Sequence, residues 1–307
     1  MNFLEFLGRH ATVFMASSVF VALILPGLAS ALNPLLTPAI WGLLFLAMVR
    51  LNWLSVKLSI GRWRVSSIAL LWILIGSPTL IWSCVMHLDV APGIAIAMVL
   101  MASSAPLNSV PAMVMMMGLN GALALVVMIG ATFLLPITMP IIAFEFMNVR
   151  LDMSAWEMAG RLTAILVSAL GVSILCRQYV GTKRITTWET KSDGVVVILM
   201  AVFAIAIMDG VTALLIEDPI RILMIILLSF AANALLQLIG FGLFKSIGLR
   251  DAITLGFASG SRNMGIILAV LPASSDPDIM LYFALAQFPM YVYPVLLKPL
   301  VGKWVGP

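Results

Sequence analysis

Charged side chains are the first thing this sequence lacks. Asp, Glu, Lys and Arg make up 10% of the 307 residues, whereas hydrophobic residues make up 63%. A soluble domain has a charged fraction of about 25%, because its surface is covered with polar groups. The composition therefore excludes an ordinary soluble domain and predicts a protein that crosses the lipid bilayer several times.

Residues that commonly carry enzyme chemistry are also few. The only histidines, His10 and His87, lie at the ends of apolar stretches, and the only cysteines, Cys84 and Cys176, lie within apolar stretches of different halves. These residues form neither a metal-type cluster nor a disulfide framework, and no Ser/His/acid set is evident. We therefore expect no enzyme activity, no metal and no cofactor, and an intramembrane enzyme is the last of the alternatives.

The apolar stretches divide the chain into ten expected spans. A helix needs about 20 apolar residues to cross a bilayer, and Pro, Gly and charge clusters mark the boundaries. The expected spans are 8–28, 34–52, 65–86, 91–117, 120–147, 155–178, 193–214, 217–246, 251–273 and 278–302. The pattern predicts an all-α membrane protein with ten transmembrane helices. For the first span, the alternative is a secretory signal that ends at Ala29-Ser-Ala31.

The basic residues set the expected orientation. With the N-terminus inside, Arg150, Arg161 and Arg221 are the basic residues at the outer side, and Arg262 lies within a span. This distribution agrees with the retention of Lys and Arg in cytoplasmic loops. We therefore expect both termini in the cytoplasm and the chain in the cell (inner) membrane. Because topology explains the net charge of +4, we expect no nucleic-acid partner.

An even division places five spans in residues 1–150 and five in residues 151–307. Because each half has an odd number of spans, the halves enter the membrane in opposite directions, as in an inverted repeat. Weak internal similarity favours this division, since Ser104-Ala-Pro-Leu-Asn-Ser109 in the fourth span corresponds to Ser259-Gly-Ser-Arg-Asn263 in the ninth. Prolines also punctuate the span that follows in each half.

Arg262 stands out because it lies in the middle of an apolar span. An arginine at the centre of a membrane helix costs on the order of 3 kcal/mol on insertion scales, so it usually faces a cavity or a partner on a substrate path. Arg262 either takes part in substrate binding or is a structural cation held by backbone carbonyls or by an acid such as Glu145 or Asp209. The functional role is our leading hypothesis.

Small and polar residues interrupt the fourth and ninth spans, at 102–112 and 259–263. The helix is expected to stop and restart there inside the membrane. A restarting helix presents free N–H groups and the positive end of its dipole. Two such ends beside Arg262 would suit a carboxylate, so the sequence predicts a small organic anion as substrate.

Polar residues near the two breaks form the candidate site. We expect Asn108 or Ser109 to cap the restart in the fourth span, and Ser261 to cap the restart in the ninth. Asn233 and Gln237, one turn apart in the eighth span, either line the same cavity or bridge neighbouring helices. The candidate substrate-binding residues are Asn108, Ser109, Ser259, Ser261, Arg262 and Asn263, and the supporting residues are Ser104, Asn233 and Gln237.

Several motifs also occur together in this chain. They are Asn233-Ala-Leu-Leu-Gln-Leu-Ile-Gly-Phe-Gly242, Gly248-Leu-Arg-Asp-Ala-Ile-Thr254, Gly260-x-x-Asn-x-Gly265, Ala105-Pro106, Asn120-x-Ala-Leu123 and Pro136-x-x-x-Pro140. Together they resemble the bile acid:sodium symporter family. The resemblance implies ten helices, with spans 1, 2, 6 and 7 in a panel domain and spans 3–5 and 8–10 in a core domain. It also implies that spans 4 and 9 cross at a substrate site between these domains, and that transport proceeds by alternating access.

The chain departs from this family where its members bind sodium. Their Glu-x-Gly-x-Gln-Asn signature reads Ala258-Ser-Gly-Ser-Arg-Asn263 here, so Ala258 replaces the carboxylate and Arg262 replaces the glutamine. The position of a further glutamine in the third span is occupied by Ile73. A sodium ion needs oxygen ligands, so we do not expect it to bind. Arg262 is expected to replace its charge.

The resulting hypothesis is a secondary transporter in the lipid bilayer that moves a small organic anion, such as a carboxylate, without sodium. It would act as a uniporter, as an exchanger or in a proton-linked manner. One alternative is a sodium-coupled symporter with displaced ion ligands. Another is a membrane receptor or scaffold that transports nothing.

Overall fold

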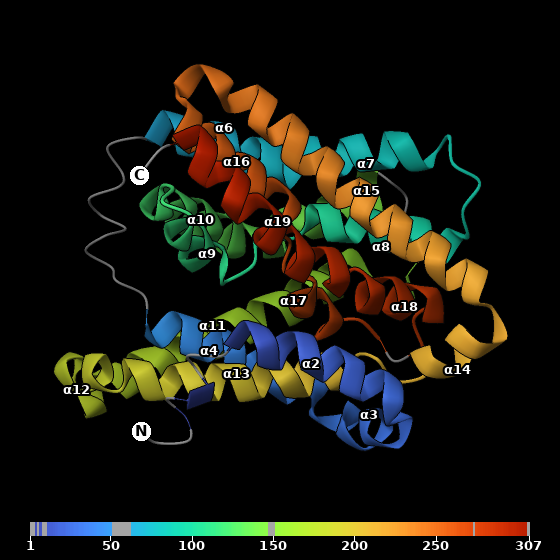
Figure 1. Cartoon of the computed structure of the whole chain (residues 1–307), viewed down its shortest axis with the longest axis horizontal. Coiled ribbons are helices and arrows are strands. Elements are labelled where there is room, and N and C mark those ends of the chain that lie inside the picture. Colours follow the sequence, from blue (N-terminus) through green and yellow to red (C-terminus); the bar gives the residue numbers. More distant parts are fainter. Residues whose placement is uncertain are drawn as a thin grey trace. The chain divides into compact units, whose positions relative to one another are not determined.

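The computed structural model describes residues 4, 6–7, 11–50, 63–146, 151–272 and 274–305, and apart from one isolated β-bridge their regular structure is helical (Figure 1). Within this part of the chain, 6 helices are long and apolar enough to cross a membrane. They are Pro26–Val49, Trp63–Val85, Gly121–Phe144, Ala155–Val180, Pro219–Ile247 and Pro277–Trp304. The pair Ser192–Ala206 and Val211–Glu217, bent by 41°, raises the number to 7 if it is one span. These helices indicate a multi-pass membrane protein.

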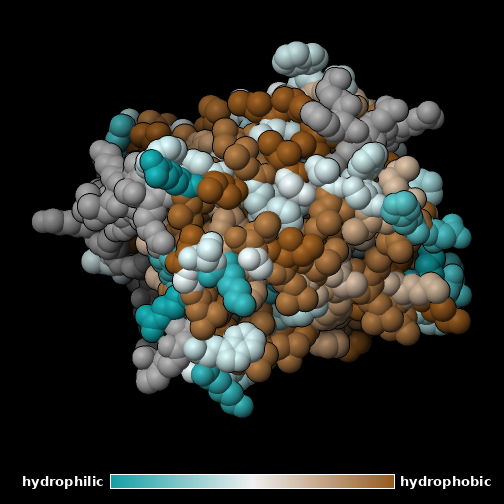
Figure 2. All heavy atoms as spheres, turned by 90° about the horizontal axis from the view of Figure 1, so that it is seen from above, coloured by the Kyte–Doolittle hydropathy of each residue, from teal (hydrophilic) through white to brown (hydrophobic). Residues whose placement is uncertain are grey.

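Large apolar side chains cover much of the exposed surface. Figure 2 shows broad areas of hydrophobic residues on the visible face, with hydrophilic residues in smaller groups. On helix α15 (Pro219–Phe244), Leu227 and Leu238 are 59% and 68% exposed. A soluble monomer rarely exposes so large an apolar surface, because water would surround it. The surface agrees with contact to lipid.

The fourth and ninth expected spans are interrupted where the sequence predicts. Helix α8 (Pro92–Ser103) is separated from α9 (Val110–Met116), and α16 (Leu249–Gly260) is separated from α17 (Met264–Leu268). Each of these pieces is too short to cross a bilayer alone. The same holds for α2 (Ala11–Ile24) in the first expected span. The described helices therefore give 6 to 7 candidate spans, where the sequence predicts ten.

The chain forms two compact units. Unit 1 contains residues 1–51 and 163–222, and unit 2 contains residues 52–162 and 223–307. The division cuts across the expected halves at residue 150, because each unit draws segments from both halves. Each unit is described separately below.

Unit 1 is organised around helix α13 (Glu189–Ala206), which packs against α2 and α4 (Leu36–Val49). Its remaining elements are α3 (Pro26–Leu32), η1 (Asn33–Leu35), most of α11 (Ala155–Val180), α12 (Thr182–Thr187) and α14 (Val211–Glu217). Asp209, between α13 and α14, accepts hydrogen bonds from the Ser30 hydroxyl (2.6 Å) and the Asn33 amide (3.0 Å). These bonds tie the α13–α14 bend to the turn between α2 and α4.

Unit 2 contains both interrupted segments. Its other elements are α6 (Trp63–Leu71), a π-helical turn η3 (Trp72–Gly76), α7 (Ser77–Val85), α10 (Gly121–Pro140), a π-helical turn η4 (Ile141–Phe146), α15, η5 (Lys245–Ile247), α18 (Pro277–Leu285) and α19 (Gln287–Val305). One hydrophobic cluster joins α6, η3, α10 and α16, and includes Ala69, Ile73, Val127 and Leu255. A second joins α9 and α16 with α19, and includes Val114, Phe257 and Val301. Helix α16 lies in both clusters, so the unit packs around it.

Candidate functional site

The two breaks cross each other in the interior of unit 2. Pro106 and Arg262 form an antiparallel β-bridge. The Leu107 N–H donates to the Ser261 carbonyl (2.9 Å), and the Asn263 N–H donates to the Ala105 carbonyl (2.8 Å). A break in a helix releases backbone donors and acceptors that are costly to bury without partners. Each break supplies hydrogen-bond partners for the other, and these bonds stabilise both interruptions.

The caps expected at the two restarts are not found. The residue before α9 is Ser109 and the residue before α17 is Asn263, and neither side chain caps its helix. The Ser109 hydroxyl instead lies 3.8 Å from the Met113 sulfur. Ser261, expected as a cap, lies in the bridged segment. The backbone of the opposite break takes up N–H groups of Leu107 and Asn263, which were not assigned partners from the sequence.

Arg262 is fully buried at the crossing, with no exposed surface, and its guanidinium is held by oxygen atoms. Its Nε donates to the Ser259 carbonyl (2.6 Å), and its Nη1 donates to the carbonyls of Ser104 (2.7 Å) and Ile73 (3.1 Å). Its Nη2 donates to the Ser77 hydroxyl (2.6 Å). We call these four groups the oxygen cage. It joins α16, the break after α8 and the turn between α6 and α7.

The π-helical turn η3 makes the Ile73 carbonyl available to the cage. The Ser77 N–H bonds to the Trp72 carbonyl, one residue further back than in an α-helix. The next residue, Pro78, has no N–H to offer the Ile73 carbonyl. That carbonyl therefore accepts from the Arg262 guanidinium and from the Ser77 hydroxyl (2.8 Å). In the sequence, Ile73 stood out only because a glutamine is missing there, and Ser77 was not predicted to take part.

Among the described residues, no carboxylate takes part in the cage. Asp209, one of the acids considered from the sequence, belongs to unit 1 and accepts from Ser30 and Asn33. The other, Glu145, has a side chain outside the described part of the structure. Backbone carbonyls are thus the main partners of Arg262. This is the structural alternative weighed above, and the partners of Arg262 in the described part of the chain are all neutral.

Other candidate residues fix the end of α16. The Ser259 hydroxyl donates to the Leu255 carbonyl (2.6 Å) and accepts from the Trp72 indole (2.9 Å). The Asn233 amide on α15 donates to the Gly260 carbonyl (2.9 Å), and Gln237 donates to Asn233 (2.5 Å). Asn233 and Gln237 therefore bridge α15 to α16, which is one of the two roles that the sequence left open.

Three polar side chains at the crossing take no part in holding it. Asn108 is half-buried, and Ser261 and Asn263 are 3% and 7% exposed. In the described part of the structure, these side chains make no hydrogen bond, although the backbone of two of them pairs across the crossing. They are the groups of the candidate site that remain available to a ligand.

Asn120, between α9 and α10, forms a further polar cluster. Its side-chain oxygen caps α10 by accepting from the Leu123 N–H (3.1 Å), and its amide donates to the Asp251 carboxylate (2.7 Å). Its backbone N–H donates to the Thr254 hydroxyl (3.1 Å). One residue therefore ties the end of the first interrupted segment to the start of the second. In the sequence, these residues stood out only as parts of motifs.

Replacing Asn120 by alanine should lower the free energy of unfolding by about 3 kcal/mol, because it removes a helix cap and leaves the buried Asp251 without the amide. Thermal unfolding in detergent measures the change. Asp276→Ala is the matched control, because Asp276 caps α18 by accepting from the Asp278 N–H, and losing that cap should cost about 1 kcal/mol. Equal losses in the two variants would contradict a tie between Asn120 and α16.

Comparisons with known proteins give no relative from which a role for this site can be taken: no family model matches the chain, and no curated protein matches it. Within the described residues, no group of three or more His, Cys, Asp or Glu side chains is placed to hold a metal ion. The interpretation of the site therefore depends on its own geometry.

Proposed function

We propose that this chain is a secondary transporter of a small organic anion that works by alternating access without sodium. The observation that carries the proposal is the oxygen cage around Arg262. Three carbonyls and a hydroxyl from separate segments converge there, and such a set of neutral oxygens is the kind of environment that binds a hard monovalent cation. An arginine that fills it supplies a permanent cation, so no sodium is needed to hold the crossing together.

The positive charge also favours an anionic substrate. The four partners of Arg262 are neutral, so the crossing keeps a net positive charge in a medium of low dielectric constant. Asn108, Ser261 and Asn263 offer hydrogen bonds nearby, since their side chains are not used to hold the crossing. We propose that Arg262 acts on the substrate through its charge, and that these three side chains, with Ser109, make the direct contacts.

The proposal also includes ten spans and membership of the bile acid:sodium symporter family, and the division into units agrees with the panel and core sets that the resemblance implies. Unit 1 contains expected spans 1, 2 and 7 and most of span 6, and unit 2 contains spans 3–5 and 8–10. These are the sets proposed for the panel and the core of a bile acid:sodium symporter family member. The localisation we propose is the cell inner membrane, with both termini in the cytoplasm.

The arrangement of α8–α10 and α16–α18 favours an inverted repeat. Helices α8 and α16 each have 12 residues and end at a break. Asn120 and Asp276 cap the helices that follow the two segments. Asn120, which caps α10, bonds Asp251 at the start of α16. Asp276, which caps α18, lies at the start of α8, since a Cβ on Gly93 would lie 2.6 Å from its carboxyl group.

The first test measures the thermal stability of the purified protein in sodium chloride and in choline chloride at equal ionic strength, with and without small carboxylates. We expect no sodium-specific rise in Tm and a rise with a carboxylate that binds, because a ligand of the folded state stabilises it. Exchange of that labelled carboxylate across liposomes then separates a transporter from a receptor. A sodium-specific rise would favour the sodium-coupled alternative, and binding without exchange would favour a receptor.

A further inference from the structure

We propose that the pocket between the start of α16 and the end of α19 binds the phosphate headgroup of an anionic glycerophospholipid. The pocket has a volume of ≈ 430 Å³ and is lined by Gly248, Leu249, Arg250, Asp251 and Trp304. This volume lies within the range of ligand sites, which is about 300–1,000 Å³. None of these residues belongs to the oxygen cage, and the inference does not depend on the proposed transport.

The pocket lies at an end of unit 2 where several helix ends meet. One hydrophobic cluster includes Val65 of α6, Ile247 of η5 and Ala252 of α16. The other includes Ile253 of α16 and Val301 of α19. Figure 1 shows the start of α6, the end of α15 and the end of α19 on the same side of unit 2. Charged residues on these helix ends therefore share one surface.

This surface is basic. On the described elements α6, α15, η5, α16 and α19, the acidic residue is Asp251, which is buried and accepts from the Asn120 amide. The exposed cations at this end are Arg64, Lys245, Arg250 and Lys303. In the orientation proposed above, they face the cytoplasmic leaflet, whose anionic lipids attract basic residues next to the membrane. The charge of this surface therefore favours an anionic ligand.

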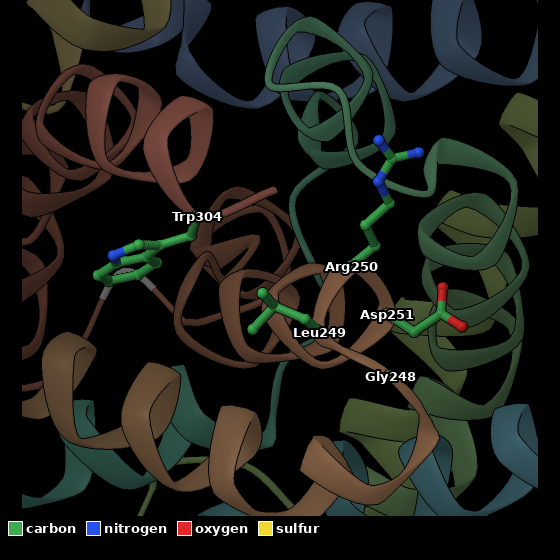
Figure 3. Close-up of a pocket in the computed structure, with 5 residues that line it drawn as sticks. All are labelled: Gly248, Leu249, Arg250, Asp251 and Trp304. Carbon is green, nitrogen blue, oxygen red and sulfur yellow. The ribbon is translucent and has the colours of Figure 1, made fainter. Parts of the chain in front are cut away.

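Apolar side chains lie beside these cations. Trp304 and Leu249 both line the pocket and are 57% and 42% exposed. Figure 3 shows the Trp304 ring on one side of Leu249. A tryptophan ring is favourable at the level of the lipid headgroups, because it has an apolar body and one polar N–H group. The pocket therefore suits a ligand that joins a negative charge to an apolar part, which favours a phospholipid over a free phosphate ion.

Arg250 is the cation that contacts the phosphate in this proposal. Its side chain is exposed and forms no ion pair among the described residues. Figure 3 shows it extending in a different direction from the Asp251 carboxylate. A guanidinium group donates several N–H groups in a geometry that matches phosphate oxygens. The phosphate then lies at the edge of the pocket beside Arg250, and the glycerol and the first acyl carbons contact Leu249 and Trp304.

The experiment measures thermal unfolding of the purified protein in a neutral maltoside detergent at low ionic strength. Dioctanoyl phosphatidylglycerol, dioctanoyl phosphatidylcholine and inorganic phosphate are titrated separately, and the rise in Tm with concentration gives the affinity. We expect a rise with phosphatidylglycerol. Phosphatidylcholine has the same acyl chains without a net charge, and inorganic phosphate has the charge without the chains, so neither should produce a comparable rise.

Two pairs of variants locate the site. Arg250→Gln should weaken phosphatidylglycerol binding about fivefold, which is the contribution of one cation near an anionic lipid surface. Lys298→Gln is its matched control, because Lys298 is an exposed cation on α19 that does not line the pocket. Trp304→Ala should weaken binding by a similar factor. Trp63→Ala should leave it unchanged, because Trp63 is equally exposed, at 60%, but lies outside the pocket.

The outcomes that would overturn the proposal are distinct. Equal losses in Arg250→Gln and Lys298→Gln would show a diffuse attraction to the basic surface and no site. An equal rise in Tm with phosphatidylcholine would show that charge is not recognised, and an equal rise with inorganic phosphate would show an anion site without a lipid. Absence of any rise with phosphatidylglycerol would also reject the site. If Arg250→Gln does not fold, the three titrations of wild type and the tryptophan pair decide the question.

Discussion

Replacing Arg262 by alanine is expected to lower the free energy of unfolding by on the order of 4 kcal/mol. The guanidinium is fully buried and makes four hydrogen bonds to the cage. Its removal leaves carbonyls without donors in a place that water does not reach, and each such group costs about 1–3 kcal/mol. Thermal unfolding in detergent measures the effect, and a drop in Tm on the order of 10 °C is the expected result.

Chemical rescue separates the cage from a general packing defect. Methylguanidinium at millimolar concentration should raise the Tm of Arg262→Ala and leave that of wild type unchanged, because only the variant has room for the ion and a ligand of the folded state stabilises it. Arg161→Ala is the matched control. Arg161 donates to Glu157 (2.5 Å) and to the Val270 carbonyl (3.0 Å), but its side chain is 43% exposed. This variant should lose about 1 kcal/mol and show no rescue.

The same stability measurement also tests whether sodium binds in the emptied cage. If the cage suits a monovalent cation, sodium chloride should stabilise Arg262→Ala relative to choline chloride, and should have no such effect on wild type. The proposal that Arg262 takes the place of an ion would be contradicted by a variant as stable as wild type, or by one that neither cation stabilises.

The sequence predicted the position of the crossing but not its partners. Arg262 stood out because a charge in an apolar span needs an explanation, and the polar interruptions marked both breaks. Its partners are mostly backbone carbonyls, which no side-chain pattern reveals. Ser77 became important only because the π-helical turn frees the Ile73 carbonyl beside it. That turn depends on tertiary contacts as well as on Pro78.

The expected caps are absent, and the backbone pairing across the crossing was not predicted. Ser109 and Ser261 have side chains that commonly cap helices, and local rules predicted them to satisfy the free N–H groups. Neither Ser109 nor Asn263 caps the helix that follows it, and carbonyls of the opposite break accept from Leu107 and Asn263, which precede α9 and α17. Such contacts join residues more than 150 positions apart, so they follow from the fold and not from the local sequence. The contact of Asn120 was not predicted for the same reason, because its partner Asp251 lies in the other half of the sequence.

Glycine at position 260 is expected to be nearly as sensitive as Arg262. A Cβ added there would lie 2.5 Å from the Gln237 side chain and 2.7 Å from the Asn233 carbonyl oxygen, both on α15. The backbone of α15 cannot yield without moving the helix. Gly260→Ala should therefore push apart α15 and the end of α16, and lower the free energy of unfolding by about 3 kcal/mol.

The displacement should also weaken the cage, because the Gly260 carbonyl accepts from Asn233 and the backbone of Ser259 holds Arg262. Gly242→Ala is the matched control on α15, since a Cβ there meets nothing within 4 Å. Alanine is the better helix former by about 1 kcal/mol, so this variant should be as stable as wild type or slightly more stable. Thermal unfolding of the two variants side by side is the measurement. Similar stabilities would show that α15 and α16 do not pack closely at Gly260, and the Asn233 contact that fixes the end of α16 would then have to be abandoned.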